Sequence, residues 1–258
     1  MSALLRAEGV SKAYGGVQAL DECSVEVREG SISGLIGPNG SGKTTLFNMI
    51  TGYGRVDSGE VFLRDRRITN LSPDRVFGVG IGRTFQLTRI FPRLTAMENM
   101  LIAAQHSGEH KVRNPLARAG GAADRRRAMD LLDFMTIGQY AQMPAEHLSY
   151  GQRKLLELAY VLVANPKVVL LDEPAGGVNP TLIHLIADRI RDLNRSGTTF
   201  LIVEHNMQFV MDLCDQVTVL DYGTVIAAGP PAIIREDRRV LDAYLGVAED
   251  DDDDDAAS

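Results

Sequence analysis

Continuous apolar segments alternate with amphipathic ones in the second half of the chain. Val168–Leu171 and Phe200–Val203 are apolar runs of strand length. The stretch between them, Pro180–Asn194, has apolar residues at helical spacing, and Gly197 lies just past its end, as is common for a helix. Strands that are apolar throughout and alternate with helices predict an α/β fold with a parallel sheet covered on both faces.

The N-terminal third has shorter runs that are rich in branched residues. Leu4–Val10 and Cys23–Val27 predict strands, and Ser31–Ile36 predicts a strand that leads into a glycine-rich segment. A helix is predicted directly afterwards, over Thr44–Thr51. Near the C-terminus, Tyr222-Gly223 separates two short apolar runs, which predicts a closing hairpin.

The segment between residues 86 and 148 has helical patterning, clearest over Asp124–Met135. We expect one domain, residues 1–248, in which residues 87–160 form a helical lobe. Residues 1–86 and 161–248 then form a core lobe that includes a β-subdomain. The basic residues of the helical lobe lack interleaved aromatics, so we interpret them as a solvated helix face and expect no nucleic-acid partner.

Length and charge fit this organisation. The chain has 258 residues, within the range of a single α/β domain of about 250 residues, and 45% of them are hydrophobic. The formal net charge of -7 is accounted for by the acidic block Glu249 to Asp255. A block of like charges has no apolar surface to bury, so residues 249–258 are expected to form a disordered, solvated tail on a neutral body.

Cysteine usage and hydropathy indicate the compartment. Cys23 and Cys214 are far apart and do not form a metal-binding or disulfide framework, which fits two buried thiols in a reducing cytoplasm. No run approaches the roughly 20 apolar residues that cross a bilayer, and Met1–Arg6 does not start like a secretory signal. We therefore expect a soluble chain that depends on other polypeptides for any passage through a membrane.

A glycine-rich segment between the predicted strand and helix has the composition of a phosphate-binding loop. Its backbone N–H groups can approach phosphate oxygens closely because glycines leave room, and the helix start adds its positive dipole end. Lys43 is expected to neutralise the β and γ phosphates of ATP, and the Thr44 hydroxyl to bind Mg²⁺. The predicted loop consists of Gly37, Pro38, Asn39, Gly40, Ser41, Gly42, Lys43 and Thr44.

Two carboxylates follow the apolar run Val168–Leu171. Asp172 stands at the carboxyl end of the predicted strand, the edge at which open parallel sheets bind ligands, and we expect it to reach Mg²⁺ through water. Glu173 is the natural general base for an attacking water, because a carboxylate beside the γ phosphate can accept its proton.

Three further positions are candidates for nucleotide contacts. Gln86 stands where the core lobe gives way to the helical lobe, and its amide is expected to touch Mg²⁺ or water when nucleotide is bound. His205 follows the strand Phe200–Val203 and is expected to hold the γ phosphate through a ring N–H. Ser149 is suited to cap a helix that begins at Tyr150 or Gly151, and this helix start offers a second anion site.

Taken in order, these segments resemble the ATP-binding cassette family. The resemblance extends from about Leu5 to Gly246 and implies a P-loop NTPase fold, with a RecA-like, mostly parallel sheet, an antiparallel β-subdomain and a helical subdomain. It also implies a head-to-tail dimer with two ATP molecules between the phosphate loop of one subunit and the Leu-Ser-x-Gly-Gln segment of the other. The further nucleotide contacts that it implies are Tyr14, as an adenine-stacking aromatic, Thr45, Ser149, Gly151 and Gln152.

Within that family the chain is most similar to the ATPases of branched-chain amino-acid importers. The similar segments are Arg83–Gln86, Phe91–Asn99, Leu148–Gln152, Ala175–Pro180 and Val240–Gly246. Importers of urea or other amides and lipopolysaccharide exporters share much of this sequence. Tyr150 replaces the first glycine of the pentapeptide, and Asn179 stands where many cassettes have aspartate.

The resemblance implies an ATPase on the cytoplasmic face of the inner membrane. Its expected partners are permease subunits, a second cassette of the same or a related kind, and indirectly a periplasmic substrate-binding protein. Two alternatives remain open at this stage: a soluble cassette that acts on nucleic acid or ribosomes, and a nucleotide-gated scaffold that does not hydrolyse ATP.

Overall fold

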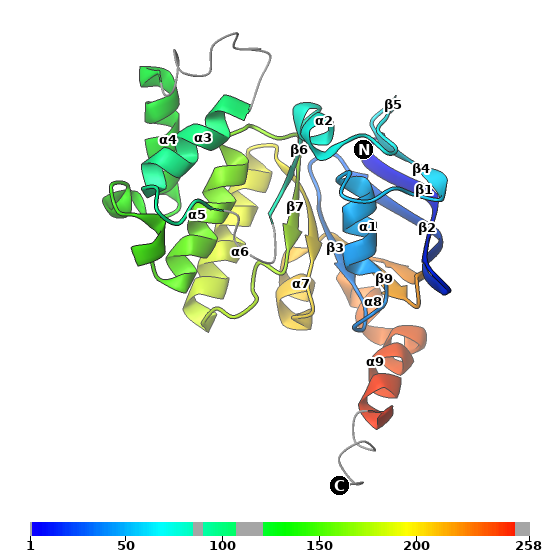
Figure 1. Ribbon diagram of the computed structural model, residues 1–258. Helices are drawn as coiled ribbons and strands as arrows, with labels where there is room; N and C mark the ends of the chain where they lie inside the picture. The colour runs from blue at the N-terminus through cyan, green and yellow to red at the C-terminus, as the bar shows by residue number, and fades with distance from the viewer. Residues whose placement is uncertain (1, 85–89, 107–120, 251–258) are drawn as a thin grey trace, which may run out of the picture. The chain divides into compact units, whose positions relative to one another are not determined.

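The computed structural model describes residues 2–84, 90–106 and 121–250. The chain divides into two compact units, and Figure 1 labels their helices and strands. The first unit combines Met1–Pro73 with Thr199–Ser258, and the second unit is Asp74–Thr198. The lobe boundaries predicted from the sequence remain a prediction. No helix within the described ranges is both long and apolar enough to cross a membrane.

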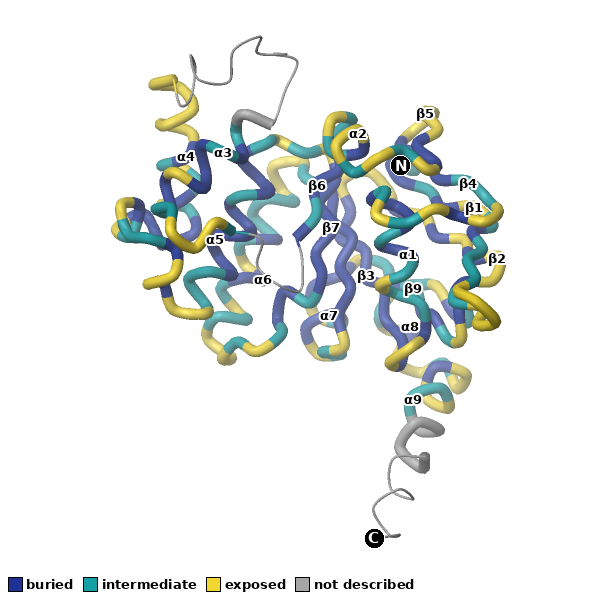
Figure 2. The backbone as a smooth tube through the Cα atoms, in the orientation of Figure 1, coloured by how far each residue is buried: buried dark blue, intermediate teal, exposed yellow. Residues whose placement is uncertain are grey.

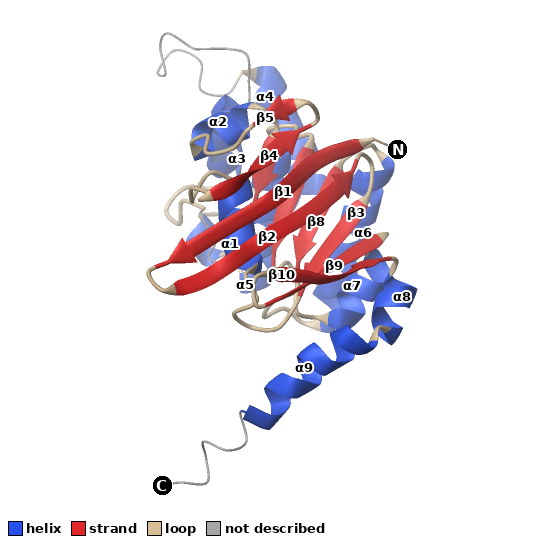
Figure 3. Ribbon diagram, turned by 90° about the vertical axis from the view of Figure 1, so that its right-hand side faces the viewer, coloured by secondary structure: helices blue, strands red, loops and turns tan. Residues whose placement is uncertain are grey.

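An antiparallel sheet forms one part of the first unit, with strand order β2-β1-β4-β5 (Figure 3). Buried and exposed residues alternate along the second half of β2, as expected for a sheet with one face toward solvent. The two predicted N-terminal strands are confirmed but are longer than expected, because their polar halves also pair across the turn at Gly15. The strands are β1 (Ala3–Tyr14), β2 (Val17–Arg28), β4 (Ser58–Leu63) and β5 (Arg66–Arg67).

A second group of strands in the first unit is mainly parallel. β3 (Ile32–Ile36) lies between β8 (Thr199–Val203) and β9 (Gln216–Asp221) and runs parallel to both. Every residue of β3 and β8 is buried, and Figure 2 shows the dark blue course of β3. The predicted parallel strands are therefore confirmed, and their continuous apolar sequences are explained by burial on both faces.

The predicted C-terminal hairpin is also confirmed. β10 (Thr224–Gly229) pairs antiparallel with β9, and the two turn residues, Tyr222 and Gly223, have φ values of 42° and 81°. Two successive positive φ values match the tight turn whose twist suits a two-stranded ribbon. The helices of this unit are α1 (Lys43–Ile50), α7 (Met207–Leu213), α8 (Pro231–Glu236) and α9 (Arg238–Asp250).

The second unit combines two parallel strands with a group of helices. β6 (Ile81–Arg83) pairs in parallel with β7 (Val168–Asp172), which places Arg83 opposite Leu170. The helix predicted over Asp124–Met135 is confirmed, and its Ala128 and Leu132 are fully buried. The helices are α2 (Pro73–Gly78), α3 (Ala96–His106), α4 (Ala122–Phe134), α5 (Tyr150–Leu162) and α6 (Pro180–Arg195), with short 3₁₀ turns η1 (Gly138–Tyr140) and η2 (Ala145–His147).

The α/β class predicted from the sequence is confirmed by this mixture of parallel strands, antiparallel sheet and helices. The predicted acidic tail is described only at its start, because α9 extends through Asp250 and residues 251–258 lie outside the described residues.

Candidate nucleotide site

The glycine-rich segment connects the end of β3 with the start of α1 in the first unit. Gly40 and Gly42 have φ values of 77° and 101°, in the left-handed region that favours glycine. Gly42 is also the N-cap of α1 and supplies no side-chain hydrogen bond to the helix start. The first N–H groups of α1 are therefore suited to an anion, as are the exposed backbone positions Asn39 and Gly40.

Neighbouring backbone holds this loop tightly. A Cβ atom on Gly37 would overlap the Leu220 carbonyl, and one on Gly42 would lie 2.6 Å from the Ala19 carbonyl oxygen. Gly223 N–H donates to Ser41 O over 3.0 Å, and Asp21 N–H donates to Gly223 O over 3.0 Å. The loop is thus braced by the hairpin turn of β9 and β10 as well as by its own strand and helix.

The Lys43 ammonium lies over the carbonyl oxygens of the loop. Its Nζ donates to Gly37 O over 2.8 Å and to Pro38 O over 2.7 Å. The Ser41 hydroxyl is 3.4 Å from the same nitrogen. Thr44 is exposed and Thr45 half-buried at the start of α1. A cation held at the centre of a glycine loop is the arrangement that a polyphosphate requires.

Tyr14 and His205 belong to the same unit as the loop. Tyr14 ends β1, its ring is exposed, and Lys12 Nζ lies 5.3 Å from the ring centroid. The His205 side chain is 62% exposed and follows β8. Its backbone N–H donates to Glu204 Oε2 over 3.1 Å, and Asn206 N–H donates to the same oxygen over 3.2 Å. Buried Glu204 therefore shapes the turn that presents His205.

Tyr244 on α9 brings the C-terminal helix to the start of the phosphate loop. Burial raises the pKa of the Tyr244 phenol to about 12, and a contact with the Gly37 backbone limits that rise. No sequence pattern indicates this contact, because Tyr244 lies 207 positions after Gly37 in the chain.

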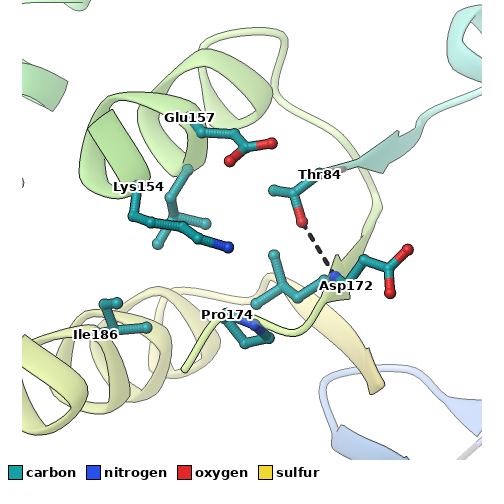
Figure 4. A pocket seen from close by; sticks show the side chains of 8 residues that line it. Thr84, Lys154, Glu157, Asp172, Pro174 and Ile186 are labelled. Atoms are coloured by element: carbon teal, nitrogen blue, oxygen red, sulfur yellow. Dashed lines mark hydrogen bonds between the residues drawn. The ribbon is translucent and has the colours of Figure 1, made fainter. Parts of the chain in front are cut away.

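Asp172 lies in the second unit at the carboxyl end of β7, as predicted (Figure 4). Its Oδ2 accepts from Arg83 Nη2 over 3.0 Å, and both side chains are only 7% exposed. The Asp172 N–H donates to Thr84 Oγ1 over 3.1 Å. Sequence reasoning missed Arg83 and Thr84 as neighbours of this carboxylate, although Arg83 ends strand β6 beside β7 and Thr84 directly follows it.

Glu173 is held in an unusual backbone conformation. Its φ is 49°, which is uncommon for a residue with a side chain and marks a constrained position. The Glu173 carbonyl oxygen accepts from Lys154 Nζ over 3.2 Å and from Gly176 N–H over 3.1 Å. Figure 4 shows Lys154 and Glu157 on one helix, facing the segment that contains Asp172 and Pro174.

Ser149 caps α5, as its sequence position predicted. Its Oγ accepts from Gln152 N–H over 3.3 Å, and the Gln152 Oε1 accepts from Ser149 N–H over 2.8 Å. These two bonds form a capping box. A Cβ atom on Gly151 would collide with Leu182, so glycine lets α5 approach α6 closely.

The two departures from the family pattern both have local structural roles. The Tyr150 hydroxyl donates to Gly176 O over 3.1 Å. Asn179 is the N-cap of α6, and its Oδ1 accepts from Leu182 N–H over 2.9 Å, with Pro180 in the first helical turn.

The predicted site residues thus fall into two sets. The first unit contains Tyr14, the loop and His205, and the second contains Asp172, Glu173 and the segment Ser149–Gln152. Gln86 lies outside the described residues.

Comparison with known proteins shows the family to which the chain belongs. A family model described as ABC transporter matches residues 20–176, and one described as branched-chain amino acid ATP-binding cassette transporter matches residues 224–250. The chain is 37% identical over 248 residues to the probable branched-chain amino acid transport ATP-binding protein LivG of Archaeoglobus fulgidus. That alignment covers 95% of this chain and 96% of its relative.

Solved structures agree with this result. The ADP conformation of MJ1267, an ATP-binding cassette of an ABC transporter, has a TM-score of 0.86 at 35% identity, over 95% of this chain and 100% of that chain. The dimeric structure of MJ0796, a bacterial ABC transporter cassette, has a TM-score of 0.77 at 26% identity, over 88% and 98%. The cassette fold predicted from the sequence is therefore confirmed, and the chain belongs to the ABC transporter family as one of its ATP-binding cassettes.

Proposed function

We propose that this chain is the ATP-hydrolysing, energy-coupling subunit of an importer for branched-chain amino acids. The ATP chemistry is supported above all by the phosphate loop, in which Lys43 Nζ lies 2.8 Å from Gly37 O and 2.7 Å from Pro38 O. The substrate class is supported by the relatives and by the match at residues 224–250.

The first unit supplies the residues that bind ATP. Lys43 neutralises the β and γ phosphates, and the loop N–H groups from Gly37 to Thr45 surround them. Because Pro38 has no N–H, it contributes a fixed backbone shape instead of a donor. Tyr14 stacks on the adenine, and its exposed ring leaves a face open for this contact.

The side chains predicted to hold Mg²⁺ offer oxygen atoms, which are the ligands that Mg²⁺ prefers. The Thr44 hydroxyl, the Asp172 carboxylate and the Gln86 amide would hold it. When bound, the ion spreads the charge of the β and γ phosphates. Arg83 orients the Asp172 carboxylate through their 3.0 Å contact.

Glu173 is the general base. Its carboxylate accepts a proton from the attacking water as the water oxygen bonds to the γ phosphorus. The bond between the γ phosphorus and the β–γ bridging oxygen breaks, and ADP leaves with that oxygen. His205 donates a ring N–H to the γ phosphate oxygens. The turn at Glu204 fixes the backbone on which His205 stands.

The segment at the start of α5 serves the nucleotide of a second cassette. Ser149, Gly151 and Gln152 present a helix N-terminus, which suits an anion. The dimeric structure of MJ0796 supports the pairing of two cassettes. The second cassette is a copy of this chain or a related subunit. Residues 87–160 act as the helical lobe that receives the membrane subunits, and residues 1–86 with 161–248 act as the core lobe.

The working complex is peripheral on the cytoplasmic face of the inner membrane. Permease subunits form the passage, and a periplasmic binding protein delivers the amino acid. Nucleic acid is not a partner in this proposal.

Glu173→Gln tests the assignment of the base. We expect ATP binding to persist, an ATP-dependent dimer to accumulate, and hydrolysis to fall by about 10²-fold or more. Phosphate release and analytical size-exclusion chromatography measure these effects. Glu146→Gln, at an exposed position of the same unit, is the matched control and should hydrolyse normally. Wild-type turnover in Glu173→Gln would refute the role of Glu173.

The substrate is tested in vesicles that contain the co-purified permease and binding protein. Leucine should stimulate ATP hydrolysis and urea should not. Stimulation by urea alone would assign the chain to an amide importer instead.

A further inference from the structure

Two side chains of α5 reach the loop that carries Glu173. The Tyr150 hydroxyl donates to Gly176 O over 3.1 Å, and Lys154 Nζ donates to Glu173 O over 3.2 Å. Both acceptors are backbone carbonyls between the end of β7 and the start of α6. The start of α5 is therefore tied to the loop at two points.

The contact between Tyr150 and the loop is close. Gly177 has a φ of 69°, and a Cβ atom there would lie 3.3 Å from the Tyr150 hydroxyl oxygen. Lys154 Nζ lies 5.9 Å from the centroid of the Tyr150 ring, so the two side chains also contact each other. Glycine at position 150 would provide neither the ring nor the hydroxyl.

Lys154 is held in place by burial. The residue is 9% exposed, and with Glu157 it lines a small cavity of about 20 Å³ that also contacts Asp172 and Pro174 (Figure 4). A buried ammonium needs a polar partner, and the Glu173 carbonyl provides one. The same bond helps to hold Glu173 at its left-handed φ of 49°.

We propose that Tyr150 and Lys154 are positioning residues that connect the nucleotide contacts of α5 to the catalytic base of the same chain. This inference rests on the proposed function, in which Ser149 at the start of α5 contacts the ATP of the second cassette. A displacement of α5 on binding that ATP is passed to the loop through two hydrogen bonds, one to the Gly176 carbonyl and one to the Glu173 carbonyl. Tyr150 is therefore the residue by which this chain strengthens coupling between the two ATP sites.

Tyr150→Phe removes a single oxygen atom and keeps the ring. We expect kcat for ATP hydrolysis to fall roughly three- to tenfold, as for the loss of one hydrogen bond, and the KM for ATP to stay within about twofold. The Hill coefficient for ATP should fall toward one. Tyr140→Phe, in the same unit, is the matched control and should change none of these quantities.

Lys154→Met and Lys154→Arg give a second measurement. Lys154→Met should lower kcat, and Lys154→Arg should restore part of it because a donor returns. In the Tyr150→Phe, Lys154→Met double variant, the two losses in kcat should not multiply, since both act on one loop. Thermal unfolding of each variant shows whether the fold persists.

Unchanged kcat and Hill coefficient in folded Tyr150→Phe would overturn the positioning role, as would a rise in KM alone. Failure of the proposed function has a different signature, namely full hydrolysis by Glu173→Gln. The two proposals can therefore fail separately.

Discussion

Arg83 and Asp172 neutralise each other in the interior of the second unit. Their side chains are equally buried, and Arg83 lies 89 positions before its partner. An ion pair of this kind contributes little beyond what apolar residues would provide, but one buried charge without the other is strongly destabilising. The pair thus has a structural role that is separable from the proposed role of Asp172 in holding Mg²⁺.

Arg83→Met should lower the free energy of unfolding by about 3–5 kcal/mol, because Asp172 would remain as a buried, unpaired charge. Urea denaturation measures the change. Arg191→Met, which breaks the exposed pair between Arg191 and Asp188, should lower stability by less than about 1 kcal/mol. If the Arg83→Met, Asp172→Leu double variant recovers stability, the unpaired Asp172 charge is the cause of the loss. If stability does not recover, this explanation is wrong.

The two thiols make stability sensitive to alkaline pH. Burial raises the pKa of Cys23 and of Cys214 from 9.0 to about 12. The unfolded chain therefore loses these protons before the folded protein does, and the stability that they contribute is complete below pH 9 and declines as the pH rises toward 12. Unfolding free energies at pH 8 and pH 10 should show the decline.

A Cys23→Ala, Cys214→Ala variant should be less stable at pH 8 because of the lost packing, but its stability should change less between pH 8 and pH 10. An equal slope in the two proteins would show that other groups cause the decline. Tyr244 contributes only at higher pH, since its pKa rises from 10.0 to about 12.

At the level of elements, segments with a regular apolar pattern could be predicted from the sequence. Segments in which polar residues interrupt that pattern could not. The apolar repeats of α4 and α6 and the unbroken runs of β7 and β8 gave correct positions because their burial follows the pattern directly. The polar halves of β1 and β2 carry no such pattern, since their pairing is fixed by the partner strand. Short β6 is defined only by its pairing with β7.

The start of α6 shows how a departure from the family pattern is accommodated. Asn179 caps the helix through its side-chain oxygen, a contact that aspartate can also make. Asn179→Ala should lower the free energy of unfolding by about 1 kcal/mol, whereas Asn179→Asp should leave it within about 0.5 kcal/mol. Denaturant titration measures both free energies of unfolding. Equal losses in the two variants would show that the helix cap does not account for the stability contributed by Asn179.

At the level of the whole molecule, sequence motifs predict where the chemistry takes place but do not predict the contacts that support it. The phosphate loop, Asp172, Glu173 and Ser149 were recognisable because each motif is continuous along the chain. The contacts of Arg83 with Asp172 and of Tyr150 with Gly176 join separate segments, so spacing could not indicate them. Tyr244 reaches Gly37 from the opposite end of the chain for the same reason.

Ligand binding should stabilise the whole protein. ATP with Mg²⁺ at a hundredfold excess over its Kd should add about 3 kcal/mol to the unfolding free energy of Glu173→Gln, which cannot consume it. Differential scanning calorimetry should record a higher Tm, and chelation of Mg²⁺ should reduce the gain. Lys43→Met in the same background should abolish the shift, and Lys167→Met, at an exposed lysine, should retain it. A preserved shift in Lys43→Met would place the nucleotide elsewhere.

The tip of the β9–β10 hairpin has a consequence for protein engineering. Tyr222 is 83% exposed, and such a tip would ordinarily be the first choice for an inserted epitope or fluorescent label. The adjoining Gly223, however, links Asp21 to Ser41 through its backbone. A peptide inserted there would disturb the backbone contacts that position the phosphate loop, and we expect it to weaken ATP binding. Tags should therefore be placed elsewhere on this protein.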